Sequence, residues 1–153
     1  MSISKRRWLP HASVRTPRKK IKRTRRASEG RIKGPAVTNI SSDAVKPIFS
    51  LRHLDKNFSL TTCTKEDKAA FADTLYKLSQ LSWQELRQAP RHGLGYERIS
   101  RNAIRAAIPS HIAKEIGFIA FRFYGKAPIV GYRDGEIFHI VWVDREFKLY
   151  AHG

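Results

Sequence analysis

The stretch that decides the fold is GFIAFRFYGKAPIVGYRDGEIFHIVWV, residues 117–143. It holds three segments rich in aromatic and β-branched residues, GFIAFRFYG, APIVGYRDG and EIFHIVWV, which the turn signals GKAP and RDG separate. Segments of this kind at this spacing predict consecutive antiparallel strands. After the turn DRE, the chain end FKLYAHG, residues 147–153, is predicted to add a last short strand.

The residues that precede these strands predict one earlier strand and two helices. KPIFSLRHL, residues 46–54, is the candidate first strand. TKED (64–67) and SWQE (82–85) each place an acid three residues after a Thr or Ser, which is the spacing of a helix capping box. Pro90 ends the second helix. RHGLGYERIS, residues 91–100, is expected to be a loop because of its two glycines.

The predicted fold class is therefore α+β. An N-terminal strand and two helices pack on a twisted antiparallel sheet of three to four C-terminal strands, and the opposite face of that sheet is expected to stay available. A disordered basic tail precedes this domain. We place the domain at residues 46–153 and the tail at residues 1–45, where few large apolar residues are present to offset the entropy of ordering.

The charge of the chain is concentrated in this tail. Lys and Arg number 30 against 13 Asp and Glu, which gives a formal charge of +17, and residues 1–35 alone hold 13 basic residues and one acid. Such a field attracts polyanions. The tail is predicted to be a phosphate-binding arm, with a solubilising tail as the alternative. Its central cluster consists of Arg18, Lys19, Lys20, Lys22, Arg23, Arg25 and Arg26.

The remaining composition narrows the class of protein. A single cysteine, Cys63, allows no internal disulfide, and no apolar run reaches the length of a membrane span. No secretory signal is evident, so a soluble cytoplasmic protein without a membrane partner is expected. The six histidines show no HxH or HExxH spacing, and we expect neither a metal nor a cofactor.

Alternation along the strands gathers a set of basic and aromatic side chains. Arg122 and Tyr124 share one face of the first C-terminal strand, and Lys148, Tyr150 and His152 share one face of the last. Cleavage of RNA by its own 2′-hydroxyl needs a base for the hydroxyl proton, cations for the charged phosphorane and an acid for the leaving oxygen. Histidine, arginine and tyrosine can supply these functions.

The other candidates are less well placed by alternation alone. Arg133 and Arg145 lie in or beside turns, where solvated side chains are the alternative, and His139 lies on a strand that is apolar on both faces and is interpreted as structural. Glu97 is the candidate carboxylate base. The predicted catalytic residues are Arg122, Arg133, Tyr150, His152 and Glu97; the predicted nucleic-acid contacts outside the arm are Tyr124, Arg145 and Lys148.

Residues 46–153 resemble the RelE/ParE toxin superfamily. The resemblance lies in the order of the elements, in the segments FRFYG and IVGYRDGEIFHIVWVD, and in a chain end that contains Tyr and His. The resemblance implies a small basic α+β toxin of a toxin–antitoxin locus, with mRNA, the ribosome and a cognate antitoxin as partners. It makes Arg122 and Arg133 counterparts of family arginines. The YoeB-like branch ends in His then Tyr, whereas this chain has Tyr150 before His152, and the basic tail lies outside the family pattern.

Three interpretations stay open. The first is a metal-independent endoribonuclease that cleaves mRNA on the ribosome. The second is a non-catalytic RNA- or DNA-binding protein that uses the arm and the sheet face, with aromatic side chains stacking on bases. The third is a ParE-like toxin that acts on a protein. The sequence leaves open the RNA sequence preference, ribosome dependence, the antitoxin's identity, the oligomeric state and the role of the arm.

Overall fold

The computed structural model describes residues 41–151. Residues 1–40 of the predicted arm, with its cluster at residues 18–26, lie outside the described residues, and so does His152. The described chain contains β1 (Ile48–Ser50), α1 (Lys65–Ser79), α2 (Trp83–Gln88), β2 (Tyr96–Ile99), β3 (Phe118–Tyr124), β4 (Ala127–Asp134) and β5 (Ile137–Val143), with 3-10 turns η1 (Leu60–Thr62) and η2 (Arg101–Ala103).

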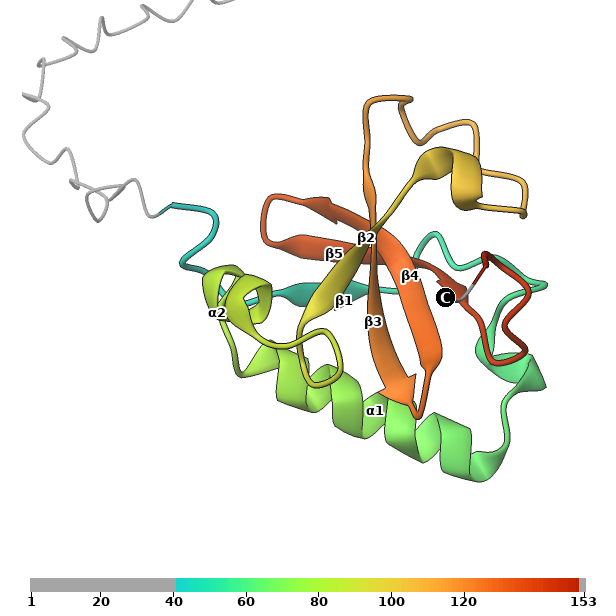
Figure 1. Cartoon of the computed structure of the whole chain (residues 1–153), viewed down its shortest axis with the longest axis horizontal. Coiled ribbons are helices and arrows are strands. Elements are labelled where there is room, and N and C mark those ends of the chain that lie inside the picture. The colour runs from blue at the N-terminus through green and yellow to red at the C-terminus, as the bar shows by residue number, and fades with distance from the viewer. Residues whose placement is uncertain (1–40, 152–153) are drawn as a thin grey trace, which may run out of the picture. The chain divides into compact units, whose positions relative to one another are not determined.

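The strands form a five-stranded mixed sheet in the order β1-β5-β4-β3-β2 (Figure 1). β2, β3, β4 and β5 pair antiparallel, whereas β1 pairs parallel with β5. The α+β prediction with two helices and a C-terminal meander is confirmed. β1 joins the sheet as a parallel edge strand, so the sheet is mixed, and the glycine-rich segment predicted as a loop contains the edge strand β2.

Side chains pack on both faces of the sheet. The helix-side core joins α1 and α2 to the sheet through residues that include Phe71, Leu78, Trp83, Leu86, Phe121, Phe123, Phe138 and Ile140. The loop-side core lies on the opposite face and contains Ile112, Phe118, Ala120, Val130, Val141, Trp142, Leu149 and Tyr150. The expectation of an available second face is therefore wrong over much of the sheet, because the segment after β2 and the chain end cover it.

A bulge in β5 changes which side chains reach each core. The register pairs Val130 with Trp142 but Gly131 with Ile140, so Val141 is an extra residue on β5. Val141 and Trp142 consequently both enter the loop-side core, while Ile140 belongs to the helix-side core. Strict alternation along β5 would place Ile140 and Trp142 on one face, and the extra residue puts them on opposite faces. A Cβ on Gly131 would lie 2.0 Å from a β5 carbonyl oxygen, so only glycine fits there.

The segment after β5 folds back instead of forming the predicted last strand. Asp144 is 1% exposed, and its carboxylate accepts hydrogen bonds from the amides of Lys148 at 2.9 Å and Leu149 at 2.8 Å. Phe147 takes up a positive φ of 59°, which lets the chain reverse direction. The fold-back inserts Leu149 into the loop-side core and leaves no strand after β5 within the described part of the chain.

The N-terminus of α1 carries the predicted capping box. The Thr64 hydroxyl accepts from the Asp67 amide at 3.1 Å, and the Asp67 carboxylate accepts from the Thr64 amide at 2.9 Å. Arg145 donates to the same carboxylate at 2.8 Å and lies over the ring of Tyr124. The Thr64 amide first, and then the Thr64 hydroxyl and Arg145, hold the pKa of Asp67 below its usual value. The equivalent box at the start of α2 is also confirmed.

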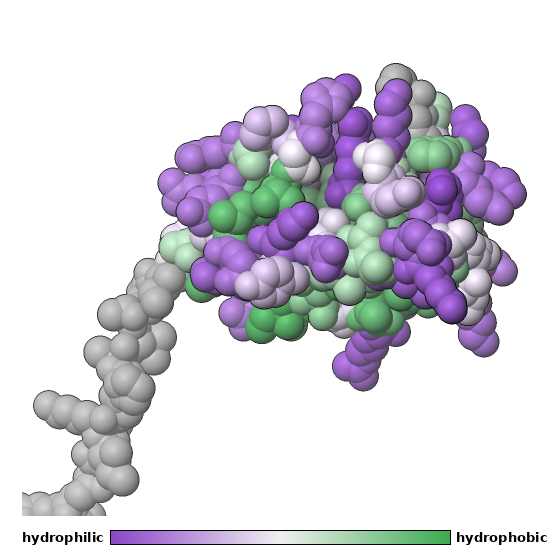
Figure 2. Space-filling view, turned by 90° about the horizontal axis from the view of Figure 1, so that it is seen from below, coloured by the Kyte–Doolittle hydropathy of each residue, from purple (hydrophilic) through white to green (hydrophobic). Residues whose placement is uncertain are grey.

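The side of the domain that carries α1 is mainly hydrophilic. In Figure 2, polar and charged side chains cover most of this face, and apolar side chains are visible between them. Among residues 41–151, no helix has the length and apolar character needed to cross a membrane.

We predict that Asp144→Ala lowers the free energy of unfolding by about 1–3 kcal/mol, because the buried amide of Leu149 and the partly buried amide of Lys148 lose their acceptor. Denaturant unfolding measures this change. The control is Asp73→Ala on the exposed face of α1, which should change the stability by no more than about 0.5 kcal/mol. An equal effect of the two substitutions would contradict the role of Asp144.

The lowered pKa of Asp67 also predicts how stability depends on pH. A carboxyl whose pKa is lower in the folded than in the unfolded state stabilises the fold above its unfolded pKa of about 3.9, and that contribution is lost as the pH falls through the folded pKa. Asp67→Asn should therefore be less stable than the wild type at pH 7, and the difference should shrink below about pH 4. Glu66→Gln, in the same first turn, is the control. A difference that stayed constant down to pH 2 would show that the charge of Asp67 has no part in it.

Candidate functional site

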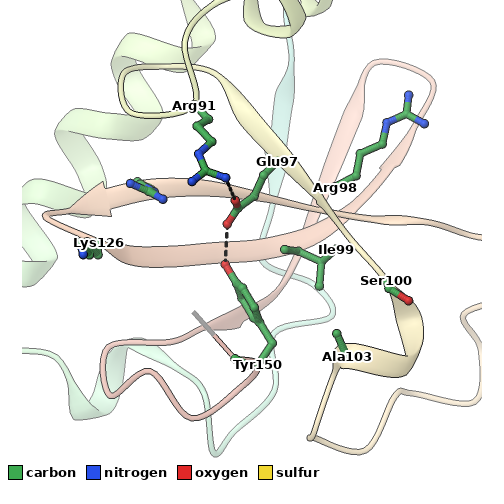
Figure 3. Close-up of a pocket in the computed structure, with 10 residues that line it drawn as sticks. Arg91, Glu97, Arg98, Ile99, Ser100, Ala103, Lys126 and Tyr150 are labelled. Atoms are coloured by element: carbon green, nitrogen blue, oxygen red, sulfur yellow. Dashed lines mark hydrogen bonds and ion pairs between the residues drawn. The ribbon is translucent and has the colours of Figure 1, made fainter. Parts of the chain in front are cut away.

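A cavity of about 280 Å³ lies beside β2 on the loop side of the sheet. We call it the Glu97 pocket. Its charged and hydroxyl-bearing walls include Arg91, Glu97, Arg98, Arg122, Lys126 and Tyr150. Arg91, Arg122 and Lys126 bring three cations to one carboxylate, and the field inside the pocket favours an anion. Figure 3 shows Arg91 and Tyr150 directed at Glu97 from opposite sides.

Glu97 is held by two partners from different parts of the chain. The Tyr150 hydroxyl donates to Oε1 at 3.1 Å, and Arg91 Nη1 lies 3.5 Å from Oε2. The side chain of Glu97 keeps 25% of its surface exposed, so a ligand in the pocket can reach the carboxylate. Burial first, and then the charge of Glu97, raise the pKa of Tyr150 far above its usual value. The phenol therefore stays protonated and acts as a hydrogen-bond donor.

Arg122 contributes a second polar pair at this pocket. Its Nη1 lies 2.8 Å from Nδ1 of His92. A guanidinium only donates hydrogen bonds, so this contact makes Nδ1 the acceptor and places the imidazole proton on Nε2. The 3.5 Å contact from Arg91 Nε to Nε2 is at the edge of hydrogen-bonding range and does not set the tautomer. The Nε2–H group of His92 thus lies next to Arg122, whose guanidinium lines the pocket.

Backbone geometry brings these groups together. Glu97 pairs with Ala120 across β2 and β3, and the small side chain of Ala120 leaves room above it for Tyr150. Arg122 follows two residues later on the same face. Gly95 lets the chain leave α2 and enter β2 at close range, because a Cβ there would lie 2.1 Å from the Ala89 carbonyl oxygen.

The pocket unites three of the five residues predicted to be catalytic: Arg122, Tyr150 and Glu97. The fourth, His152, lies outside the described residues, and in the sequence it directly follows Ala151, which lines the pocket. The predicted contacts Tyr124, Arg145 and Lys148 are not among the residues that line the pocket. Lys148 forms an ion pair of 2.5 Å with Glu146, which raises the pKa of the lysine.

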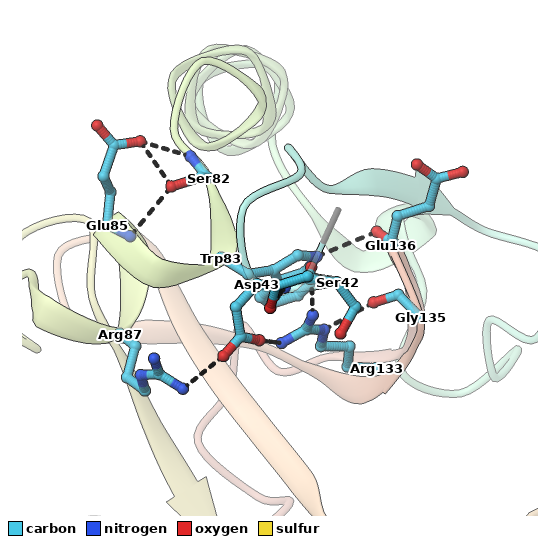
Figure 4. Close-up of polar contacts among 10 residues, drawn as sticks. Ser42, Asp43, Ser82, Trp83, Glu85, Arg87, Arg133, Gly135 and Glu136 are labelled. Atoms are coloured by element: carbon cyan, nitrogen blue, oxygen red, sulfur yellow. Dashed lines mark hydrogen bonds and ion pairs between the residues drawn. The ribbon is translucent and has the colours of Figure 1, made fainter. Parts of the chain in front are cut away.

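Arg133, the fifth predicted catalytic residue, lies on the helix side. Its guanidinium donates to Asp43 Oδ1 at 2.6 Å, to the Ser42 carbonyl oxygen at 2.6 Å and to the Gly135 carbonyl oxygen at 2.7 Å. It also stacks over the ring of Trp83 at 4.4 Å (Figure 4). The prediction of one basic face shared with Arg122 is wrong, because Arg122 and Arg133 project to opposite faces of the sheet.

Sequence reasoning missed Arg91, His92 and Lys126. The first two precede β2 in the segment RHGLGYE, where a close Arg–His–Glu grouping was the available signal. Only the tight turn at Gly95 brings them over the sheet. Lys126 lies in the β3–β4 turn, and nothing in its local sequence separates it from an ordinary turn lysine.

The fold also gathers three histidines that are far apart in the sequence. The ring of His53 lies 4.4 Å from that of His111 and 5.1 Å from that of His139, and Tyr132 stacks on His139 at 4.8 Å. Burial first, and then the two other imidazoles, lower the pKa of His53. Within residues 41–151, no group of three or more His, Cys, Asp or Glu side chains is arranged to hold a metal ion. The interpretation of His139 as structural agrees with its packing against these rings.

The chain matches no protein-family model, no curated protein and no solved structure. The chemistry of the Glu97 pocket therefore has to carry the functional proposal.

We predict that Tyr150 is the last tyrosine to ionise when the pH of the folded protein is raised, and that Tyr150→Phe removes this last step. The hydroxyl of Tyr150 is protected by burial and by Glu97, so it should not contribute to the tyrosinate absorbance that develops between about pH 10 and pH 11. The substitution should leave that early absorbance change at its wild-type amplitude. Denaturant-unfolded samples of both proteins serve as the reference, in which all tyrosines ionise together. A smaller early amplitude in the variant would place Tyr150 in an ordinary environment.

Proposed function

We propose that this chain is a type II toxin–antitoxin toxin that cleaves mRNA as a metal-independent endoribonuclease. The observation that carries the proposal is the Glu97 pocket, where one hydrogen-bonded carboxylate lies among the cations Arg91, Arg122 and Lys126. A carboxylate base inside a cationic pocket is the combination that internal attack by a ribose 2′-hydroxyl requires. The resemblance of residues 46–153 to the RelE/ParE toxin superfamily supports the same reaction class.

Glu97 takes the proton of the 2′-hydroxyl in this mechanism. The 2′-oxygen then forms a bond to phosphorus, the bond from phosphorus to the 5′-oxygen breaks, and the products are a 2′,3′-cyclic phosphate and a 5′-hydroxyl end. Tyr150 donates to one carboxylate oxygen and Arg91 lies near the other. These contacts fix the direction of the carboxylate and so position it as a base.

Arg122 and Lys126 stabilise the phosphate. The negative charge on the non-bridging oxygens increases as the phosphorane forms, and cations already in place stabilise that charge without reorganisation. Lys126 is exposed, and the guanidinium of Arg122 lies near enough to Tyr150 to act on its pKa, which puts both cationic side chains at the pocket.

An imidazole returns a proton to the leaving 5′-oxygen. We assign this step to His152, which follows pocket residue Ala151 in the sequence. Histidine suits the step, since its imidazole changes its protonation state near neutral pH.

The charge of the chain supports the partners that the resemblance implies. A formal charge of +17 favours association with mRNA and with the ribosome, which is itself a polyanion. We propose that the activity is cytoplasmic and that a cognate antitoxin protein covers the Glu97 pocket when the toxin is inactive.

We predict that Glu97→Gln lowers the cleavage rate by about 10²- to 10⁴-fold, because the amide cannot accept the 2′-hydroxyl proton. Arg122→Ala should lower it by about 10²- to 10³-fold through lost charge stabilisation. His152→Ala tests the assigned acid. Rates are measured with translating ribosomes programmed with a defined mRNA.

Glu136→Gln is the matched control, because Glu136 is an exposed carboxylate in the β4–β5 turn, and its rate should equal that of the wild type. Undiminished cleavage by Glu97→Gln, Arg122→Ala and His152→Ala, or no cleavage by any form, would reject the catalytic assignment.

A non-catalytic nucleic-acid-binding protein is the second candidate. The observation that favours it is that residues 1–35, which hold none of the residues of the Glu97 pocket, carry 13 of the 30 basic residues. This candidate predicts salt-sensitive RNA binding that falls steeply when residues 1–35 are removed, without any cleavage. A ParE-like toxin predicts growth arrest with neither RNA cleavage nor RNA binding.

A further inference from the structure

A second basic groove lies on the helix side of the same edge strand. It has a volume of about 510 Å³, and we call it the outer groove. Its charged and aromatic walls include Arg87, Tyr96, Arg98, Arg101, Lys114 and Arg133. Only one acid, Glu115, lies among its lining residues, so the groove selects for an anionic ligand.

The outer groove adjoins the Glu97 pocket across the edge strand β2. Arg98, Ile99 and Ser100 line both cavities. β2 is the outermost strand of the sheet, so a ligand can pass around its edge from one face to the other. The side chain of Arg98 is exposed and forms no hydrogen bond or ion pair with any residue in the described range, which leaves its guanidinium available at the edge of the sheet.

The walls of the groove are partly fixed and partly free. Arg133 and Arg87 share the carboxylate of Asp43, at 2.6 Å and 2.7 Å, so two cations are balanced by one acid. Arg101 donates to two carbonyl oxygens of the segment 112–113 and thereby fixes the far wall. Lys114 is exposed and has no such partner in the part of the chain that the structure describes. The groove is thus a rigid cradle with an excess of positive charge.

We propose that the outer groove binds single-stranded RNA on one side of the cleaved bond, with the strand crossing Arg98 from the Glu97 pocket. This inference rests on the proposed function and adds the path of the substrate. A phosphodiester chain carries one negative charge on every nucleotide and can meet cations on both sides of β2. Tyr96 adds an aromatic surface in the groove, as in proteins that bind single strands without sequence preference.

The test compares RNA lengths in a cleavage-deficient background. Fluorescence anisotropy measures the binding of a dinucleotide and of a single strand of about ten nucleotides, a length within the usual site size of about 4–16 nucleotides. The full chain carries Glu97→Gln in every sample. Arg87→Ala with Lys114→Ala removes two groove cations, and Lys114→Ala alone avoids disturbing the ion pair of Asp43. The control variant, Lys65→Ala with Lys77→Ala, removes two positive charges from α1 and is called the α1 control.

The groove variant should bind the longer strand about 20-fold more weakly near 0.1 M salt, and its salt slope should fall by about 1.4, which corresponds to two lost phosphate contacts. Its affinity for the dinucleotide should match that of the background protein. The α1 control should lose little affinity for either RNA.

The proposal would be overturned if the groove variant and the α1 control lost equal affinity for RNA. It would also be overturned if the groove variant lost no more affinity for the longer strand than for the dinucleotide. Binding of a poly-glutamate peptide as tightly as the longer RNA, with the same sensitivity to Lys114→Ala, would assign the groove to an acidic protein segment instead. Cleavage by wild-type protein on translating ribosomes is scored separately. Length-dependent RNA binding without any cleavage would reject the nuclease and keep the groove.

Discussion

The candidate site depends on one buried carboxylate. Asp144 accepts hydrogen bonds from two backbone amides of the segment that follows β5, and this turns the chain end back over the sheet. Leu149 then enters the loop-side core, and Tyr150 reaches Glu97 on β2. Without this fold-back, the phenol that fixes the Glu97 carboxylate would have no defined position. The chemistry of the pocket is thus set by a structural interaction with no part in the reaction.

Much of the fold could be predicted from local signals. Capping boxes, turn residues and alternation are local properties, and they indicated α1, α2 and the β3–β4–β5 meander correctly. The parallel pairing of β1 could not be predicted, because it depends on which edge of the sheet remains free. The change of side-chain alternation in β5 could not be predicted either. It comes from one extra residue, Val141, and the position of such a bulge depends on the register with the partner strand β4.

The site was predictable only in part, for the same physical reason. Arg122 and Tyr150 were identified by alternation and residue type, and Glu97 as a carboxylate near a glycine loop. Arg133 was assigned to the wrong surface, because strand alternation says nothing about which face holds the helices. The contribution of Lys126 and of the segment before β2 depends on contacts between distant elements, which no local pattern encodes.

In the proposed function, the two cavities along β2 serve as the place of the reaction and the path of its substrate. The central claim is that the Glu97 pocket promotes attack by the ribose 2′-hydroxyl. The most direct measurement is mass spectrometry of the product ends after ribosome-dependent cleavage, with a second mRNA that carries 2′-deoxyribose at the cleavage site. The account predicts 2′,3′-cyclic phosphate ends on the first mRNA and no cleavage of the second. Cleavage of the deoxy-substituted mRNA, or 3′-hydroxyl ends on the unmodified one, would contradict it.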